Sequence, residues 1–220
     1  MIKLSKRLEA ISSLVPNNSN VIDIGCDHAL LDIYLYQQKI SKKVIASDIN
    51  ENALNGAKEN IKKYNLESVI ETRLGNGLDT LEEKDNINTI VISGMGANTI
   101  VGILKNNYNK LKKVDTIIIQ SNTKLYFLRK EITKLNYKIS DELMIEDNKI
   151  YTIIKFIKGK KRYNKKELYL GPILIKKNTD TFRMNNQLET ERLNILLNMI
   201  PKHKIFERFK IKKQLKIYTK

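Results

Sequence analysis

Five short apolar runs, separated by enough chain for a helix or a long loop, constrain the fold of this sequence more than any other feature. Short runs rich in β-branched residues are typical of buried strands, and strands that alternate with helices form parallel sheets. Right-handed crossovers between such strands predict a doubly wound α/β domain. The runs are Val21-Ile22-Asp23-Ile24, Val44-Ile45-Ala46, Val69 to Arg73, Thr89-Ile90-Val91-Ile92 and Thr116-Ile117-Ile118-Ile119.

Helical patterns lie before and between these runs. Apolar residues at helical spacing predict an amphipathic helix near the start of the chain. A second helix is expected after the second run, where Asn50 is suited to cap it and Glu51 carries a charge that is favourable in a first turn. The two apolar faces are Leu4, Leu8, Ile11 and Leu14, and Ala53, Leu54, Ala57, Ile61 and Tyr64.

Two further strand-like runs, Lys138 to Ile145 and Tyr151 to Ile157, are separated only by the turn-prone segment Glu146-Asp147-Asn148-Lys149. This arrangement predicts an antiparallel hairpin. A doubly wound sheet closed by such a hairpin resembles the class I methyltransferases, whereas a dinucleotide dehydrogenase usually continues with parallel strands. Likeness of fold alone does not assign a function.

Basic residues are concentrated in the C-terminal part of the chain. Residues 1–154 contain 21 Lys and Arg against 19 Asp and Glu, a net charge of +2, whereas residues 155–220 contain 19 against 5, a net charge of +14. A codon bias that acts across the whole gene does not explain this asymmetry. A balanced domain joined to a basic one is expected of an enzyme that carries its own phosphate-binding surface. A merely solvated basic tail is the alternative.

The change in composition after Ile157 predicts a domain boundary there. From Lys176 to Ile200 the sequence lacks Pro and Gly, and six residues follow the 4-3-4-3-4 spacing of a coiled pair of helices. Pro201 interrupts this pattern, and Lys202 to Thr219 can form a second, basic helix with Ile211, Leu215 and Tyr218 on one side. We therefore expect a small C-terminal α-helical coiled-coil domain. The six residues of the pattern are Phe182, Asn186, Glu189, Leu193, Leu196 and Ile200.

Several classes of protein are disfavoured. No apolar run is long enough to span a bilayer, and the basic start, Met1 to Arg7, is not followed by a signal-peptide core, so we expect a cytoplasmic protein without a membrane segment. The single cysteine, Cys26, cannot form an internal disulfide. Because His28 and His203 lie far apart in the sequence, we expect no metal. No stable protein partner is inferred.

The segment after the first strand, Asp23-Ile24-Gly25-Cys26-Asp27-His28-Ala29, is the most informative one for chemistry. A glycine at the carboxyl end of a buried strand lets the backbone approach a ligand closely. An ordinary strand-to-helix turn also fits this glycine. Asp48, however, follows Gly25 at about the 20-residue spacing at which an acid meets ribose hydroxyls. The two signals together predict a nucleotide cofactor.

Two later strand ends add to this site. Gly75-Asn76-Gly77 follows the third strand, where the glycines allow a tight loop and Asn76 offers a donor and an acceptor to an adenine edge. Ser93-Gly94-Met95-Gly96 follows the fourth strand and combines flexible backbone with a soft apolar side chain, where a transferred methyl group and a target base would meet. Each segment also fits a plain turn.

With these residues assembled, the chain resembles the bacterial TrmK family of tRNA (adenine(22)-N1)-methyltransferases. The resemblance covers nearly all of residues 1–220. The family pattern usually has serine at Cys26, often has aspartate at Asn76, and often has Leu-Pro at Leu31-Asp32. The ordered set of motifs consists of Leu4-Ser5-Lys6-Arg7-Leu8, Asp23 to Ala29, Gly75-Asn76-Gly77-Leu78, Ser93-Gly94-Met95-Gly96, Gln120-Ser121-Asn122, Glu146-Asp147 before Tyr151, and Leu170-Gly171-Pro172.

The resemblance implies a methyltransferase domain over residues 1–157, dependent on S-adenosylmethionine, and a basic helical hairpin over residues 158–220 that binds tRNA. The implied cofactor contacts are Asp23, Ile24, Gly25, Cys26, His28, Asp48, Ile49, Asn50, Asn76, Gly77, Ser93 and Gly94. The implied RNA contacts are Lys6, Arg7, Lys160, Lys161, Arg162, Lys212 and Lys213.

The resemblance also implies the catalytic residues Asp27, Ser93, Gly94 and Met95. Adenine N1 carries a free lone pair, so no base is needed before attack on the activated methyl group. Methylation makes the ring cationic, and Asp27 is expected to orient the exocyclic amine and to accept charge or a proton from it. His28 has an equally good alternative as a structural hydrogen-bonding residue.

Two other functions fit part of the pattern. A class I methyltransferase acting on another RNA, a protein or a small molecule would share Asp23, Gly25 and Asp48, but it leaves the basic C-terminal part unexplained. A non-catalytic RNA-binding protein is disfavoured because glycines and acids are intact at three successive strand ends.

Overall fold

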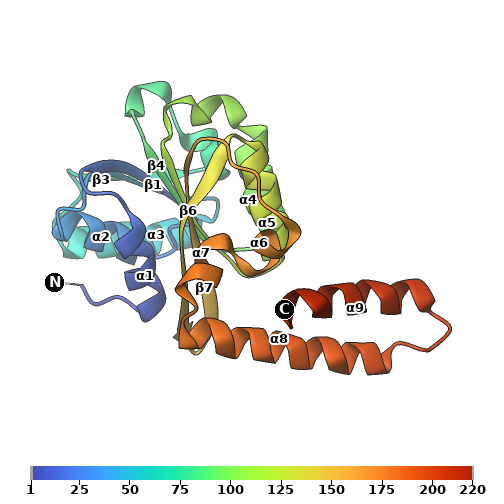
Figure 1. Cartoon of the computed structure of the whole chain (residues 1–220). Helices are drawn as coiled ribbons and strands as arrows, with labels where there is room; N and C mark the ends of the chain where they lie inside the picture. Colours follow the sequence, from blue (N-terminus) through green and yellow to red (C-terminus); the bar gives the residue numbers. More distant parts are fainter. Residues whose placement is uncertain (1, 220) are drawn as a thin grey trace. The chain divides into compact units, whose positions relative to one another are not determined.

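The computed structural model describes residues 2–219, which form two compact units (Figure 1). The first unit ends at Arg162 and the second begins at Tyr163. The change in composition predicts a boundary after Ile157. Strand pairing continues past that point, because Lys158 pairs with Tyr137 and the backbone N–H of Gly159 donates to the carbonyl of Asn136 at 2.8 Å.

One seven-stranded sheet organises the first unit, with the strand order β3-β2-β1-β4-β5-β7-β6. The first five strands are parallel, while β7 runs antiparallel to both β5 and β6. The expected doubly wound sheet with an antiparallel closing hairpin is confirmed. The strands are β1 (Ser19–Ile24), β2 (Ser41–Asp48), β3 (Ile70–Leu74), β4 (Thr89–Met95), β5 (Thr116–Ser121), β6 (Tyr137–Asp147) and β7 (Lys149–Lys158).

The chain order reverses at β1, which pairs with β2 on one side and with β4 on the other. Ile24, the last residue of β1, lies opposite Ser47 of β2 and Ile92 of β4. The loops that follow these strands therefore leave the sheet at the same edge. In open α/β sheets, this reversal at the carboxyl ends of the strands is where ligands bind.

Helices cover both faces of the sheet. In Figure 1, α1, α2 and α3 lie on one face and α4 and α5 on the other. Asn50 caps α3 as expected, since its side chain accepts from the backbone N–H groups of Asn52 and Ala53. The helical elements are α1 (Lys6–Leu14), α2 (Leu30–Gln37), α3 (Glu51–Lys63), η1 (Gly77–Thr80), η2 (Glu83–Asp85), α4 (Ala97–Asn106), η3 (Tyr108–Lys113) and α5 (Leu125–Lys134).

The core consists of the apolar runs that predicted the strands. Ile22, Ile45, Ile90 and Ile118 are fully buried between the helical layers. Burying a side chain of this size contributes roughly 1.5–3 kcal/mol relative to leaving it exposed. These runs therefore hold the sheet, and with it the carboxyl edge, in a fixed position.

The turn of the closing hairpin is tighter than expected. The turn lies within the predicted segment Glu146 to Lys149, but β6 and β7 remain paired as far as Asp147 and Lys149. Only Asn148 lies between them, and its φ of 61° is in the left-handed region. Asparagine tolerates this region better than most residues, which allows the chain to reverse there.

The second unit is entirely helical in its described part, with α6 (Lys165–Leu170), α7 (Pro172–Lys177), α8 (Asp180–Met199) and α9 (Ile205–Tyr218). The sequence had predicted only the last two helices. The pattern expected to begin at Lys176 is broken at Asn178, whose φ is 43°, and α8 starts after Thr179, whose side chain accepts from the N–H of Phe182. Helices α8 and α9 pack against each other.

Candidate active site

The loop after β1 has an unusual backbone. Gly25, Asp27 and Ala29 have φ values of 78°, 51° and 53°. Non-glycine residues in the left-handed region cost about 1–3 kcal/mol each and persist only where neighbouring bonds hold them. Here the N–H groups of Gly25 and Cys26 both donate to the carbonyl of Ser47, at 2.8 and 3.1 Å. These two hydrogen bonds hold the loop against the end of β2.

Asp48 joins the loops that follow β1 and β2. Its Oδ2 accepts from the N–H of Asp27 at 3.3 Å, and its Oδ1 accepts from the N–H of Asn50 at 2.9 Å. Each carboxylate oxygen keeps a further lone pair for a hydroxyl group. Next to it, Ile49 is 68% exposed and offers an apolar surface to a planar ring. The side-chain oxygen of Asn50 is occupied as the cap of α3.

The loop after β3 lies against the same edge. The N–H of Gly75 donates to the carbonyl of Asp48 at 2.9 Å. Gly77 is buried with a φ of 57°, and a Cβ there would lie 2.8 Å from Cγ2 of Ile103. A side chain at this position is therefore excluded both by backbone strain and by space. Asn76, between the two glycines, is exposed.

The end of β4, Ser93-Gly94-Met95, forms what we call the acceptor loop. The ladder to β5 shifts register between Ser93 and Met95, as in a β-bulge, and Gly94 has a φ of 79°. Bulges of this kind occur next to active sites, where they redirect the chain. A Cβ at Gly25 would clash with Cε of Met95, so the acceptor loop packs directly on the loop after β1.

Two side chains hold the backbone of Gly94 through its N–H and its carbonyl group. Its N–H donates to Oε1 of Gln120 at 2.9 Å, and its carbonyl accepts from Nδ2 of Asn122 at 2.7 Å. Gln120 also donates to Asn122, at 3.0 Å, and accepts from Nη1 of Arg7, at 3.1 Å. Neither Gln120 nor Asn122 could be assigned a role from the sequence, although both lie in a motif at the end of the fifth strand.

These loops enclose a pocket of about 180 Å³. Ile24, Asp48, Ile49, Asn50, Asn76, Gly77 and Met95 do not line this pocket but lie at the strand ends beside it. Arg7, predicted as an RNA contact, lines the pocket itself; its guanidinium also lies 5.5 Å from the ring of Tyr151. The residues that line the pocket are Arg7, Leu8, Asp23, Gly25, Cys26, Asp27, His28, Leu30, Leu31, Ser93 and Gly94.

Burial raises the pKa values of several groups at and behind the pocket. Burial and, to a smaller extent, the charge of Asp48 raise the pKa of Asp23 to about 7, although Arg7 opposes the rise. Oδ1 of Asp23 has no hydrogen-bond partner among residues 2–219. Behind it, burial and then the charge of Asp23 raise the pKa of Asp32 well above its ordinary value. Burial likewise raises the pKa of the Cys26 thiol, which keeps it protonated and unreactive.

Asp27 and His28 differ in how they are held. The side chain of Asp27 is 74% exposed, and its Oδ1 lies 3.6 Å from Nε2 of His28. The carbonyl of His28 accepts from Nδ2 of Asn60 at 3.0 Å, and a Cβ at Gly56 would lie 2.8 Å from its Nδ1. His28 therefore packs on α3, whereas the carboxylate of Asp27 is accessible to a ligand.

The remaining predicted RNA contacts lie outside the pocket. Lys6 is exposed on α1, Lys160, Lys161 and Arg162 are exposed at the end of the first unit, and Lys212 and Lys213 are exposed on α9. None of the helices in residues 2–219 is long and apolar enough to cross a membrane. No group of three or more His, Cys, Asp or Glu in the described chain is arranged to hold a metal ion.

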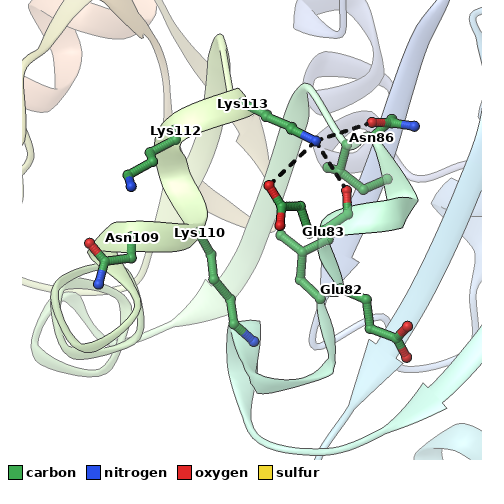
Figure 2. Close-up of a pocket in the computed structure, with 9 residues that line it drawn as sticks. Glu82, Glu83, Asn86, Asn109, Lys110, Lys112 and Lys113 are labelled. Atoms are coloured by element: carbon green, nitrogen blue, oxygen red, sulfur yellow. Dashed lines mark hydrogen bonds and ion pairs between the residues drawn. The ribbon is translucent and has the colours of Figure 1, made fainter.

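A larger cavity, of about 430 Å³, lies between residues 81–87 and η3. Figure 2 shows Lys113 reaching across it to Glu83 and Asn86. Nζ of Lys110 likewise donates to the carbonyl of Leu78 at 2.8 Å. Two of the lysines of this cavity are thus engaged by the protein itself, and none of the predicted site residues lines it.

Comparison with known proteins identifies the family. Residues 4–154 match a protein family described as "Methyltransferase domain". The structure of M. capricolum TrmK, in complex with the cofactor product S-adenosyl-homocysteine, is 32% identical and superposes with a TM-score of 0.88, covering 98% of this chain and 96% of that chain. The chain belongs to the TrmK family of methyltransferases. The resemblance found from the motifs is confirmed.

Two further comparisons agree with this placement. The tRNA (adenine(22)-N(1))-methyltransferase of Bacillus subtilis is 34% identical over 154 residues, which cover 70% of this chain and 64% of that relative. The alignment thus spans less than two thirds of the curated relative. The crystal structure of B. subtilis TrmK superposes over 100% of this chain and 98% of that chain, with a TM-score of 0.91 and 25% identity.

Proposed function

We propose that this TrmK-family chain transfers a methyl group from S-adenosylmethionine to N1 of an adenine in tRNA, at position 22. The observation that carries the proposal is the pocket in which the acceptor loop faces the loop after β1. The M. capricolum relative binds the product of this cofactor, and the B. subtilis relative is a tRNA (adenine(22)-N(1))-methyltransferase.

The residues of the pocket and of the strand ends beside it fit each part of the cofactor. The amino-acid end of S-adenosylmethionine is a zwitterion, and the pocket offers it the unpaired Oδ1 of Asp23 and the guanidinium of Arg7. Asp48 has lone pairs for the ribose hydroxyls, and the exposed Ile49 suits the adenine ring. Gly94, without a side chain, leaves room for a ligand to approach the backbone closely.

The cofactor supplies a methyl group on a sulfonium that is already activated. The protein must therefore position the acceptor nitrogen and exclude water. Gln120 and Asn122 fix the peptide of Gly94, and Met95 closes the space over Gly25. The accessible carboxylate of Asp27 orients the exocyclic amine and stabilises the cationic methylated base. Because N1 lies on the Watson–Crick edge, the target adenine must be unpaired or flipped out.

The basic residues account for the choice of substrate. The end of the first unit and α9 both expose lysine and arginine residues, and these supply phosphate contacts for a large polyanion. The unit from Tyr163 thus serves RNA binding, while the first unit carries the chemistry. As an enzyme of tRNA modification, the protein acts in the cytoplasm.

Labelled S-adenosylmethionine and unmodified bulk tRNA test this proposal. After incubation, the RNA is digested and the labelled nucleoside is identified. We expect the label in N1-methyladenosine, and a loss of most labelling when Asp48 is replaced by alanine at limiting cofactor. Label in another nucleoside would assign a different base, and label in protein alone would refute an RNA substrate.

A further inference from the structure

A connection leads from the end of α8 into α9 (Figure 1). Large apolar side chains are exposed at the start of α9. Ile205, Phe206 and Phe209 are 70%, 85% and 62% exposed. Single exposed apolar residues are common, but two phenylalanines within one helical turn are not, and a patch of this kind indicates an interaction site. Residues three apart lie on the same side of a helix, so the two rings share one surface.

Arg208 fixes this surface. Its Nη1 donates to the carbonyls of Leu197 and Ile200, each at 2.6 Å. These carbonyls belong to the C-terminal end of α8, where helical carbonyls lack partners within the helix. The arginine thereby ties the start of α9 to the end of α8. Phe206 and Phe209 therefore lie on a helix whose start is already held in place, and fixing that helix on binding costs little conformational entropy.

The positive charge around the two phenylalanine rings indicates which kind of partner this surface binds. The segment 201–218 contains seven Lys and Arg, at 202, 204, 208, 210, 212, 213 and 216, and a single acid, Glu207. That acid pairs with Lys204 at 3.4 Å, and Nζ of Lys213 lies 6.0 Å from the ring centroid of Phe209. A second copy of this surface would bring like charges together, which opposes self-association. Aromatic rings interleaved with lysines are typical of surfaces that bind single-stranded nucleic acid.

We propose that Phe206 and Phe209 stack on unpaired bases of the tRNA while the neighbouring lysines bind the adjoining phosphates. This inference rests on the proposed function and adds the kind of RNA element that α9 contacts: a loop or a pair of splayed nucleotides, and not a paired stem. Every base has a π-face, so stacking of this kind strengthens binding without reading a sequence. It differs from the phosphate contacts of Lys212 and Lys213, which depend on charge alone.

Filter binding of an unmodified tRNA transcript to the full chain, over a series of salt concentrations, tests the inference. Phe206→Ala and Phe209→Ala are each expected to weaken binding about 5-fold to 150-fold. The slope of log affinity against log salt should stay unchanged, because no counterion release is lost. Lys210→Gln should instead reduce that slope by about one. Phe209→Trp retains a ring and should bind like the wild type.

Ile195→Ala is the matched control, because Ile195 is a 60% exposed apolar residue on α8, and its loss should leave tRNA affinity unchanged. Wild-type affinity in both phenylalanine variants would overturn the inference. So would a finding that the variants lose only binding to anionic phospholipid vesicles, or only a dimer seen by sedimentation. Methylation of tRNA by the wild type is measured in parallel, and its absence would refute the proposed function. Normal methylation by the wild type, together with unchanged tRNA affinity in the two phenylalanine variants, would refute the stacking alone.

Discussion

Asp32 on α2 gives the clearest quantitative prediction. Its carboxyl is 0% exposed, and neither oxygen has a hydrogen-bond partner among residues 2–219. Burial, and then the charge of Asp23, raise its pKa well above the ordinary value. The folded protein therefore retains a proton on Asp32 that the unfolded chain releases above about pH 3.9. Up to the folded pKa, retaining this proton lowers the free energy of unfolding by about 1.4 kcal/mol for each pH unit above that value.

The pH dependence of the stability follows from the direction of this pKa shift. A carboxyl whose pKa is raised by folding contributes its full stability below the pKa of the unfolded chain, and that stability is lost as the pH rises toward the folded pKa. Asp32→Asn has nearly the same size and is neutral at every pH. We expect it to raise the free energy of unfolding by up to about 4 kcal/mol at pH 7, and by less than about 1 kcal/mol near pH 4.5.

Urea unfolding of the wild type and Asp32→Asn, without cofactor, measures this difference between about pH 4.5 and about pH 7.5. The measurement at the low end is the control, because Asp32 is protonated there and both side chains are neutral. The two curves should diverge as the pH rises. Parallel curves, or a variant that is less stable at neutral pH, would show that Asp32 is ionised and paired in the folded protein.

Substitutions at three positions test the active site. Asp48→Ala should weaken S-adenosylmethionine binding about 10-fold to 150-fold in a calorimetric titration and leave tRNA affinity nearly intact; an unchanged cofactor affinity would remove Asp48 from the site. Asp27→Asn should lower the single-turnover rate more than cofactor affinity, and a wild-type rate would refute its catalytic role. Gln120→Leu should slow the same step about 10-fold at saturating cofactor, while Gln120→Glu, which keeps an acceptor for the N–H of Gly94, should restore much of the rate. Equal rates in both Gln120 variants would contradict a positioning role.

The sheet and the strand-end motifs could be predicted because their signals are local. Apolar runs with β-branched residues predicted each parallel strand, and the spacing from Gly25 to Asp48 predicted that the two would meet at one edge. Asn50 was correctly placed as a helix cap, since capping depends only on the next few residues. The same segment also predicted a cofactor contact for Asn50, and in the structure its side-chain oxygen is used within the protein.

Other features depend on contacts that the sequence does not reveal. Gln120 and Arg7 lie more than a hundred residues apart, and only the sheet brings them together at Gly94. The short helices α6 and α7 lack a long periodic pattern, and Gly171, with a φ of 93°, separates them. The break at Asn178 was missed because asparagine is an ordinary residue in a helix pattern until its backbone conformation is known.

The position of the methyl group on the RNA tests the central claim most directly. A tRNA transcript is methylated by the protein and copied by reverse transcriptase, which stops at N1-methyladenosine because the methyl group blocks the Watson–Crick edge. We predict a stop at adenine 22, the position named for the B. subtilis relative, and no stop or label when that adenine is replaced by guanine. Undiminished methylation of the replaced transcript, or no transfer to either RNA, would contradict the proposed function.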